Sequence, residues 1–233
     1  MAENLFSLRE REIFNTLKKI KTFDFVLIGG YAVTSYTLSR FSVDCDIVVK
    51  NKEELKKIEK VLPELGYKKE EIDKTKLPYS GNFERYEKIL TNKFVVNVDI
   101  LFGEVSDRQT GIIFSADWVF ENSEIRNFKG KTINEELKLR ISNPDSLIAM
   151  KISSCRINDI RDVFMLIVHT NNKAWIKEEV SKRYNFNEKF LKIKEKINSK
   201  QFKDGLQGVF GFVDDKIFEK HKKAVLELGK IKK

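Results

Sequence analysis

The chain has 233 residues, of which 34% are charged and 41% hydrophobic, and its formal net charge is +9. This length supports one large or two small domains with a hydrophobic core, and the composition excludes a disordered or fibrous chain. No apolar run approaches the roughly 18 residues of a membrane helix, and the charged N-terminal stretch is unlike a secretory signal.

The first elements alternate between helix and strand. A capping box at Ser7 predicts the start of a helix. Residues 25–28 form a short apolar run that ends in Gly29-Gly30, which predicts a buried strand followed by a tight turn. A short helix is expected over 31–38.

The central part of the chain adds strands. Residues 44–49 predict a second strand, and the Asn51 cap predicts a helix that ends at Gly66. The strict alternation in residues 93–102 predicts the clearest strand of the chain, whereas 67–93 is ambiguous. Further short strands are expected at 112–114 and 137–141.

The character of the sequence changes at Asn143-Pro144, a favourable start for a helix that is expected to reach His169. Helices are also expected at 188–200 and 214–229, with a loop around Gly205, Gly208 and Gly211 between them. We therefore predict an α/β (α+β) fold, with a mixed-sheet domain over 1–142 and a smaller, basic helical domain over 143–233.

The charge is distributed unevenly. Residues 1–150 have no net charge, and residues 151–233 carry the whole excess of +9. A polyanionic partner would explain this, and so would solvated faces of lysine-rich helices. The cysteine and histidine residues are few and isolated, which argues against a disulfide framework, a zinc site and Ser-His catalysis, and predicts a reducing, cytoplasmic location. They are Cys45, Cys155, His169 and His221.

Three carboxylates lie in strands. Asp44 and Asp46 point to one face of their strand, and Asp99 lies in the middle of the clearest strand. A buried charge there needs a cation, hydrogen bonds or solvent. Carboxylates that converge from two adjacent strands would suit Mg²⁺, which prefers oxygen ligands. The alternative for each residue alone is a polar side chain at a strand end or a bulge.

The run LIGGYAVTSYTLSRFSVDCDIVV, residues 27–49, resembles the signature of the nucleotidyltransferase superfamily with the DNA polymerase β-like fold. Gly29-Gly30 is followed, after 13 residues, by Asp44-x-Asp46. The form Arg-Phe-Ser-x-Asp-x-Asp is most similar to the AbiEii-type abortive-infection nucleotidyltransferases, which include toxins of toxin–antitoxin pairs. Gly30 departs from the pattern, because many members have Ser there.

The second half carries a further part of this resemblance. The stretch from Asn143 to Asp162 is similar to the family's Pro-x-x-Leu-x-x-x-Lys helix, here ending at Lys151, followed by Arg156 and an Asp-x-x-Asp from Asp159. Lys151 and both aspartates are spaced near whole helical turns, so that one helix face can present them. The resemblance covers about residues 25–170.

The resemblance implies transfer of a nucleotidyl group from an NTP, such as ATP, to a hydroxyl acceptor. It implies two Mg²⁺ ions, or Mn²⁺, held by Asp44, Asp46 and Asp99, with Asp99 also accepting the proton of the attacking hydroxyl. Lys151 would be a catalytic phosphate ligand, and the alternative is a helix lysine whose apolar stem lies along the protein surface. The residues implied in nucleotide binding are Gly29, Gly30, Arg40, Ser42, Lys151 and Asp162, with a surface ion pair as the alternative for Arg40.

The acceptor stays open at this point. Family acceptors include RNA ends such as the tRNA 3′ end, protein hydroxyls and small antibiotics, and the basic second half favours RNA in a toxin-like role, with an antitoxin as a partner. A small-molecule or protein nucleotidyltransferase is an alternative. A non-catalytic nucleotide-binding module is another, although the intact aspartates argue against it. Asp159 and Asp162 would orient Lys151 or contact the nucleotide, or would pair with neighbouring arginines.

Overall fold

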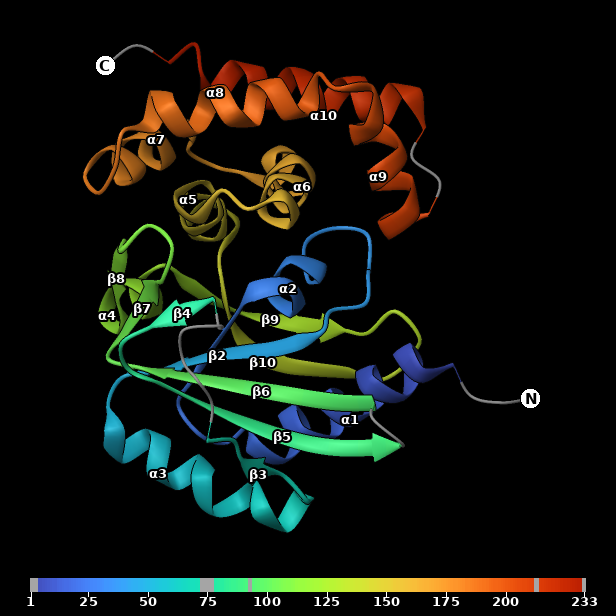
Figure 1. Ribbon diagram of the computed structural model, residues 1–233, viewed down its shortest axis with the longest axis vertical. Coiled ribbons are helices and arrows are strands. Elements are labelled where there is room, and N and C mark those ends of the chain that lie inside the picture. The colour runs from blue at the N-terminus through green and yellow to red at the C-terminus, as the bar shows by residue number, and fades with distance from the viewer. Residues whose placement is uncertain (1–3, 72–77, 92–93, 212–213, 232–233) are drawn as a thin grey trace. The chain divides into compact units, whose positions relative to one another are not determined.

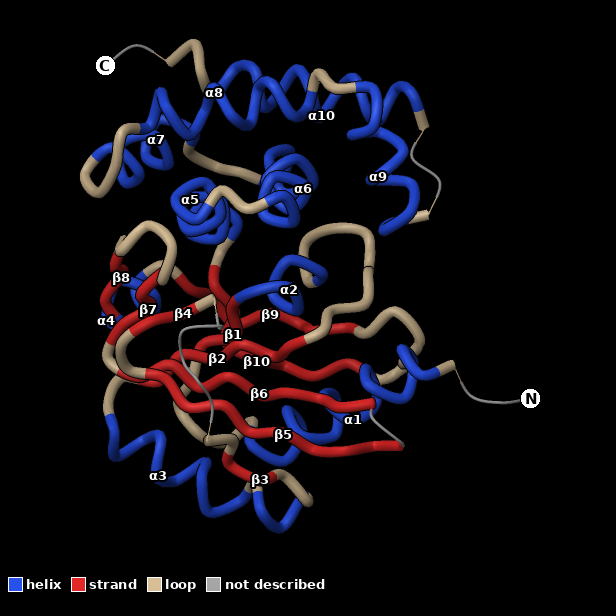
Figure 2. Tube along the Cα trace, viewed as in Figure 1, coloured by secondary structure: helices blue, strands red, loops and turns tan. Residues whose placement is uncertain are grey.

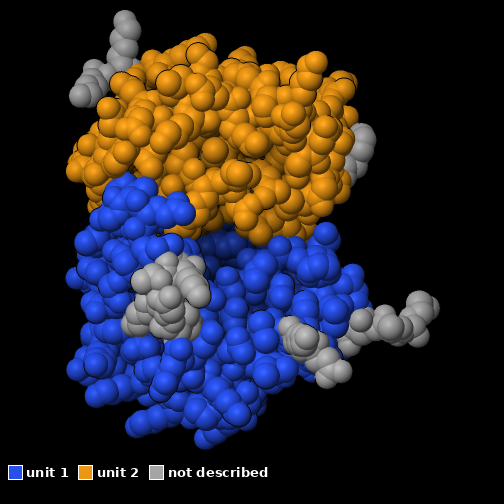
Figure 3. All heavy atoms as spheres, in the orientation of Figure 1, with its two compact units in different colours: residues 1–35, 41–142 blue, residues 36–40, 143–233 orange. Residues whose placement is uncertain are grey.

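The computed structural model describes residues 4–71, 78–91, 94–211 and 214–231 and divides into two compact units. The first unit contains 1–35 and 41–142, and the second contains 36–40 and 143–233 (Figure 3). The sequence gives no indication that residues 36–40 belong to the second unit. Within the described residues, no helix has both the length and the apolar character that a bilayer span requires.

The strands of the first unit are β1 (Val26–Ile28), β2 (Asp44–Val49), β3 (Lys68–Lys69), β4 (Tyr79–Ser80), β5 (Phe83–Thr91), β6 (Phe94–Phe102), β7 (Glu104–Asp107), β8 (Ile113–Ser115), β9 (Ser123–Lys129) and β10 (Glu136–Ser142). Seven of them form a mixed sheet in the order β3-β5-β6-β2-β1-β10-β9 (Figure 2). The pairs β2–β6 and β1–β10 are parallel, and the other neighbours are antiparallel. A small antiparallel sheet has the order β4-β7-β8.

The helices of this unit are α1 (Leu5–Ile20), α2 (Gly29–Thr34), α3 (Lys52–Val61), the short 3₁₀ helix η1 (Pro63–Leu65) and α4 (Ala116–Glu121). Both α1 and α3 pack on β6 and on each other, so they cover one face of the sheet (Figure 1). The predicted cap of α3 is confirmed, since Asn51 accepts from the Glu54 N–H. The cap predicted for α1 is wrong: Asn4, not Ser7, caps it.

Two of the strand predictions agree closely with the structure. β2 has the predicted bounds, and β6 follows the prediction, although Lys93, its expected first residue, lies outside the described residues. The nine-residue β5 lies in the stretch that the sequence left ambiguous. The short helix expected over 31–38 is wrong in its bounds, because α2 starts directly at Gly29 and ends at Thr34.

The second unit is helical, with α5 (Pro144–Ser154), α6 (Ile157–Leu166), η3 (Ile167–His169), α7 (Lys173–Ser181), α8 (Phe186–Ile197), α9 (Lys200–Phe210) and α10 (Asp215–Leu228). Asn143 caps α5, and Pro144 is its first residue, as predicted. The expected single helix up to His169 is wrong. Cys155 adopts a left-handed conformation, with φ of 56°, which ends α5 and separates it from α6.

The loop expected around Gly205 and Gly208 is also wrong, because both residues lie inside α9. Phe202, Leu206 and Phe210 recur every four residues and are buried in the second unit. This apolar stripe outweighs the roughly 1 kcal/mol by which each glycine disfavours a helix. Gly211, which the same prediction placed in the loop, does end the helix at a positive φ.

Candidate active site

The acidic residues predicted from the sequence lie in adjacent strands of the first unit. In the parallel pair of β2 and β6, Asp46 is directly opposite Asp99, and Asp44 is opposite Asn97. Cys45, between the two aspartates, is buried on the other face of the sheet, as the alternation predicts. Two rows of polar side chains therefore cross the sheet on one face, while its opposite face holds the apolar core.

A tight turn brings the backbone against one of these carboxylates. Ile28, the last residue of β1, is opposite Asp46, so Gly29 follows immediately beside it. Gly29 has a φ of +66°, and a Cβ atom there would lie only 2.0 Å from Asp46 Oδ2. Both the backbone conformation and the close approach therefore require glycine at this position.

A guanidinium group on the neighbouring strand pairs with the most buried carboxylate. Arg85 of β5 is directly opposite Asp99, and its Nε and Nη2 each donate to an Asp99 oxygen at 2.7 Å. Its Nη2 also lies 3.8 Å from Asp44 Oδ2. Burial raises the pKa of Asp99, and Arg85 opposes that rise. Burial also disfavours the charged form of Arg85, but the hydrogen bonds with Asp99 outweigh this, so the pKa of Arg85 is raised and the group stays charged.

The other two carboxylates have neutral donors. Asn97 Nδ2 donates to Asp44 Oδ1 at 2.9 Å, and the Tyr79 hydroxyl donates to Asp46 Oδ1 at 3.0 Å. The amide oxygen of Asn97, Oδ1, is buried and has no hydrogen-bond partner among the described residues. Each of the three carboxylates is thus held by a different side chain of the same unit.

The donor chemistry fits a hard divalent cation. Asp44 and Asp46 supply carboxylate oxygens, the buried Oδ1 of Asn97 is an unused neutral oxygen donor beside them, and the Arg85 guanidinium already lies as a cation between Asp44 and Asp99. In the part of the chain that the structure describes, however, no three acidic, histidine or cysteine side chains gather around one point. Both oxygens of Asp99 accept from Arg85 instead.

A second charged cluster lies in the second unit and contains the residues predicted to bind nucleotide there. Lys151 Nζ lies 2.7 Å from Asp159 and 3.0 Å from Asp162, and Arg40 donates to both oxygens of Asp162 at 2.9 and 3.0 Å. Burial would lower the pKa of Lys151, but the two aspartates raise it above its usual range. Burial would raise the pKa of Asp159, and Lys151 holds it below its usual value. Both aspartates pair with Lys151, Asp162 pairs with Arg40 as well, and Asp159 also accepts from the backbone N–H of Arg156.

The protein was compared with known families and structures. No family model matches the sequence, and no curated protein matches it. MenT4, a nucleotidyltransferase toxin from Mycobacterium tuberculosis, superposes with a TM-score of 0.59 at 14% identity, over 98% of this chain and 84% of that one. The chain has the nucleotidyltransferase fold. JHP933 from Helicobacter pylori superposes with a TM-score of 0.50 at 16% identity, over 99% of this chain and 94% of that one.

On this nucleotidyltransferase fold, the predicted site residues fall into two groups, one in each unit. Gly29, Gly30, Ser42, Asp44, Asp46 and Asp99 belong to the first unit, and Arg40, Lys151 and Asp162 to the second. Ser42 is buried, and its hydroxyl donates to the backbone carbonyl of Asp44 at 3.4 Å. The assignment of these residues to metal and nucleotide stays a prediction.

The sequence did not identify three polar residues of the carboxylate site. Arg85 and Tyr79 lie in the stretch that was left ambiguous, so neither could be paired with a strand neighbour. Asn97 could have been found, because it is two residues before Asp99 and therefore shares its face of the strand.

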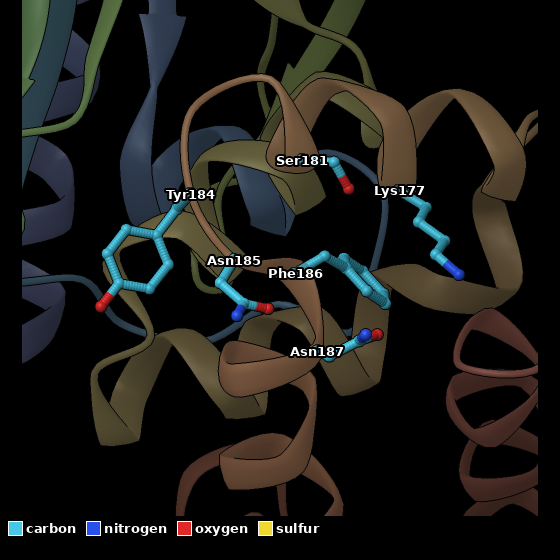
Figure 4. A pocket seen from close by; sticks show the side chains of 6 residues that line it. All are labelled: Lys177, Ser181, Tyr184, Asn185, Phe186 and Asn187. Carbon is cyan, nitrogen blue, oxygen red and sulfur yellow. The ribbon is translucent and has the colours of Figure 1, made fainter. Parts of the chain in front are cut away.

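The second unit also contains a cavity of about 420 Å³ at the connection between α7 and α8 (Figure 4). Its lining combines hydroxyl, amide and ammonium groups with the aromatic rings of Tyr184 and Phe186, and Lys177 Nζ lies 5.4 Å from the centroid of the Phe186 ring. The lining residues are Lys177, Ser181, Tyr184, Asn185, Phe186 and Asn187. None of them was predicted to have a function.

Proposed function

We propose that this protein is a nucleotidyltransferase that moves a nucleoside monophosphate from an NTP to a hydroxyl acceptor. The observation that carries the proposal is the placement of Asp44, Asp46 and Asp99 on two adjacent strands, with Asp46 directly opposite Asp99 and the Gly29 turn against Asp46. The fold supports the same activity, because a nucleotidyltransferase toxin shares it.

In the proposed reaction, an acceptor hydroxyl forms a bond to the α-phosphorus of the NTP, and the bond to the bridging oxygen of the pyrophosphate breaks. When bound, Mg²⁺ would stabilise the charge on the attacking and leaving oxygens. Asp44, Asp46 and Asp99 would hold this ion, and their fixed positions would align the reacting groups. Asp99, whose pKa is raised by burial, would accept the proton of the acceptor hydroxyl.

We propose RNA as the acceptor, with a tRNA 3′ end as the specific candidate. The support is the charge of the second unit, which carries the whole excess of +9 while the first unit is neutral. Within it, Lys173, Lys220 and Lys223 line one groove beside α10, where only Glu227 is acidic. Lysines in such an arrangement contact phosphates without sequence preference, and their binding weakens as salt is raised.

We further propose a toxin-like role with an antitoxin protein as partner, and the same comparison supports this proposal. MenT4 is described as a nucleotidyltransferase toxin, and its fold is the one found in this chain. Induced expression in a bacterial host provides the test. The wild-type chain should arrest growth, and the Asp46→Asn variant should not.

The decisive experiment incubates the protein with Mg²⁺, each labelled NTP in turn and total RNA. Label on tRNA supports the proposal, and its yield should fall steeply between 50 and 200 mM salt. Label on the protein itself indicates a protein acceptor. Label only on an added small molecule indicates the antibiotic or metabolite alternative. No transfer, with NTP binding retained, indicates a non-catalytic module, and the Asp46→Asn variant controls for contaminating enzymes.

A further inference from the structure

Arg85 is a permanent cation built into the carboxylate site. Its side chain is only 11% exposed, and it occupies both oxygens of Asp99, a residue with no exposed surface. The same Nη2 atom that donates to Asp99 lies 3.8 Å from the nearer oxygen of Asp44. A single guanidinium therefore balances the buried charge of one aspartate and reaches toward a second.

The sheet register fixes this arrangement. Arg85, Asp99 and Asp46 occupy one continuous row across β5, β6 and β2, which are neighbours in the sheet (Figure 1). Residues that are directly opposite across a strand pair point to the same face, about 5 Å apart. The pairing of Arg85 with Asp99 is thus a property of the strand alignment and not of one long side chain that happens to reach across the surface.

The position of Arg85 conflicts with loading of a divalent ion. An ionised carboxylate can accept at about four lone-pair sites, so Asp99 could bind an ion while it keeps part of its contact with Arg85. The guanidinium and the divalent ion would then lie a few ångströms apart in a poorly solvated site, where like charges repel strongly. Asp99 still needs a positive neighbour, because an unpaired buried carboxylate is costly.

We propose that Arg85 is the internal counter-cation of the carboxylate site: it holds Asp99 in the metal-free protein and yields part of this contact when a divalent cation binds. The inference rests on the proposed function, because it takes Asp44, Asp46 and Asp99 as the ion site. Arg85 is a positioning residue here. It sets how tightly the site binds the ion, and it keeps the acidic residues together before the ion arrives.

The proposal predicts two opposite effects of replacing Arg85 by a neutral residue. Arg85→Gln should lower the melting temperature of the metal-free protein, because Asp99 loses its partner. The same variant should bind Mn²⁺ at least about tenfold more tightly, because the repulsion is removed. Its melting temperature should therefore rise more on addition of Mn²⁺ than that of the wild type. A purely structural arginine would give the first effect without the second.

The test uses the purified, metal-free full chain, with Mn²⁺ affinity measured by electron paramagnetic resonance and stability by thermal unfolding with and without Mn²⁺. Arg9→Gln is the matched control, because Arg9 is similarly buried in the same unit but bonds to the Val95 carbonyl and lies over the Phe94 ring. It should lose stability and keep wild-type Mn²⁺ affinity. Arg85→Lys, which keeps the charge without the two-pronged contact, should be intermediate, and it replaces Arg85→Gln if that variant does not fold.

Two outcomes are distinguishable. If Mn²⁺ binds the wild type, and Asp46→Asn abolishes binding, but Arg85→Gln binds equally or more weakly, the Arg85 inference is wrong and the ion site stands. If Arg85→Lys, as the replacement variant, binds no more tightly than the wild type, the inference is equally wrong. If the wild type binds no Mn²⁺ at these aspartates, the proposed function fails as well.

Discussion

Gly29 offers the sharpest test of the carboxylate site, because an alanine there would add one carbon atom next to Asp46. The added Cβ would lie 2.0 Å from Asp46 Oδ2, whereas ordinary contact begins at 3.4 Å, so the carboxylate oxygen must move by about 1.4 Å. A displacement of about 1 Å at a reacting centre can lower a rate about 10²-fold. We therefore expect Gly29→Ala to lower nucleotidyl transfer by at least about 10²-fold.

The backbone contributes a separate effect. Alanine at a positive φ costs about 1–2 kcal/mol relative to glycine, which corresponds to about 2–8 °C in melting temperature for a chain of this size. Gly111 provides a matched control, because its φ of +67° is almost identical to the +66° of Gly29 and an added Cβ would contact nothing within 4 Å. Gly111→Ala should lose a similar amount of stability and keep its activity.

The assay is transfer of labelled NMP under saturating NTP, together with thermal unfolding of both variants. The reasoning is refuted if folded Gly29→Ala retains transfer within about threefold of the wild type. It is also refuted if Gly111→Ala loses as much activity as Gly29→Ala, because the loss would then come from backbone strain and not from displacement of Asp46.

Three further predictions concern other groups. Asp44→Asn should lower transfer at least about 10²-fold, because a neutral amide is a poor ligand for a hard cation. The melting temperature should change little. Near-normal transfer would show that Asp44 is not part of the site. Lys151→Met leaves buried Asp159 without its ion pair and Asp162 with Arg40 alone, so it should cost about 3–5 kcal/mol of unfolding free energy. Lys192→Met, at an exposed ion pair with Glu188, should barely shift the melting temperature, and equal shifts would contradict this. Burial lowers the pKa of His221 below 6.5. The stabilising contribution of His221 is therefore complete above pH 6.5 and is lost as the pH falls through 6.5 toward the lower folded pKa. Urea unfolding should show a smaller free energy of unfolding at pH 5.5 than at pH 7, and His221→Gln should lack this contribution to the difference.

The sequence predicted the parts of the site that lie in the regular strands β2 and β6. Asp44, Asp46 and Asp99 break apolar patterns at positions where a charge is costly, and together with the Gly29-Gly30 turn upstream this singled them out. The register that brings Asp46 opposite Asp99 could not be read from the sequence, because parallel pairing of β2 with β6 joins segments about 50 residues apart. Only the assembled sheet determines which side chains meet.

Arg85 was missed for a physical reason. The buried apolar residues of β5 are Phe83 and Tyr86, three positions apart, so the strand lacks the two-residue period that indicates a half-buried strand. Its register also shifts between Ile89 and Thr91. Arg85 consequently looked like one more surface charge in a polar stretch.

Two secondary-structure predictions for the second unit, at α9 and at Cys155, were wrong because they relied on local sequence rules. Glycines predicted a loop over α9, and the burial of Phe202, Leu206 and Phe210 overrode them. The break at Cys155 has no breaker residue, since a non-glycine residue adopts the left-handed conformation there. For α9, a deciding contact comes from a residue distant in the sequence, because the Phe202 ring packs against the ring of Phe164 in α6.

The assignment of residues 36–40 to the second unit means that the chain passes between the units three times, after residues 35, 40 and 142. A single proteolytic cut after Ser142 would therefore leave the two fragments associated, because residues 36–40 of the first fragment are part of the second unit and Arg40 is paired there with Asp162. Neither unit corresponds to one continuous stretch of gene. A truncated chain ending at Ser142 would keep Arg40 but lose its buried acidic partner, so dissection of this protein into its units requires relinking residues 35 and 41.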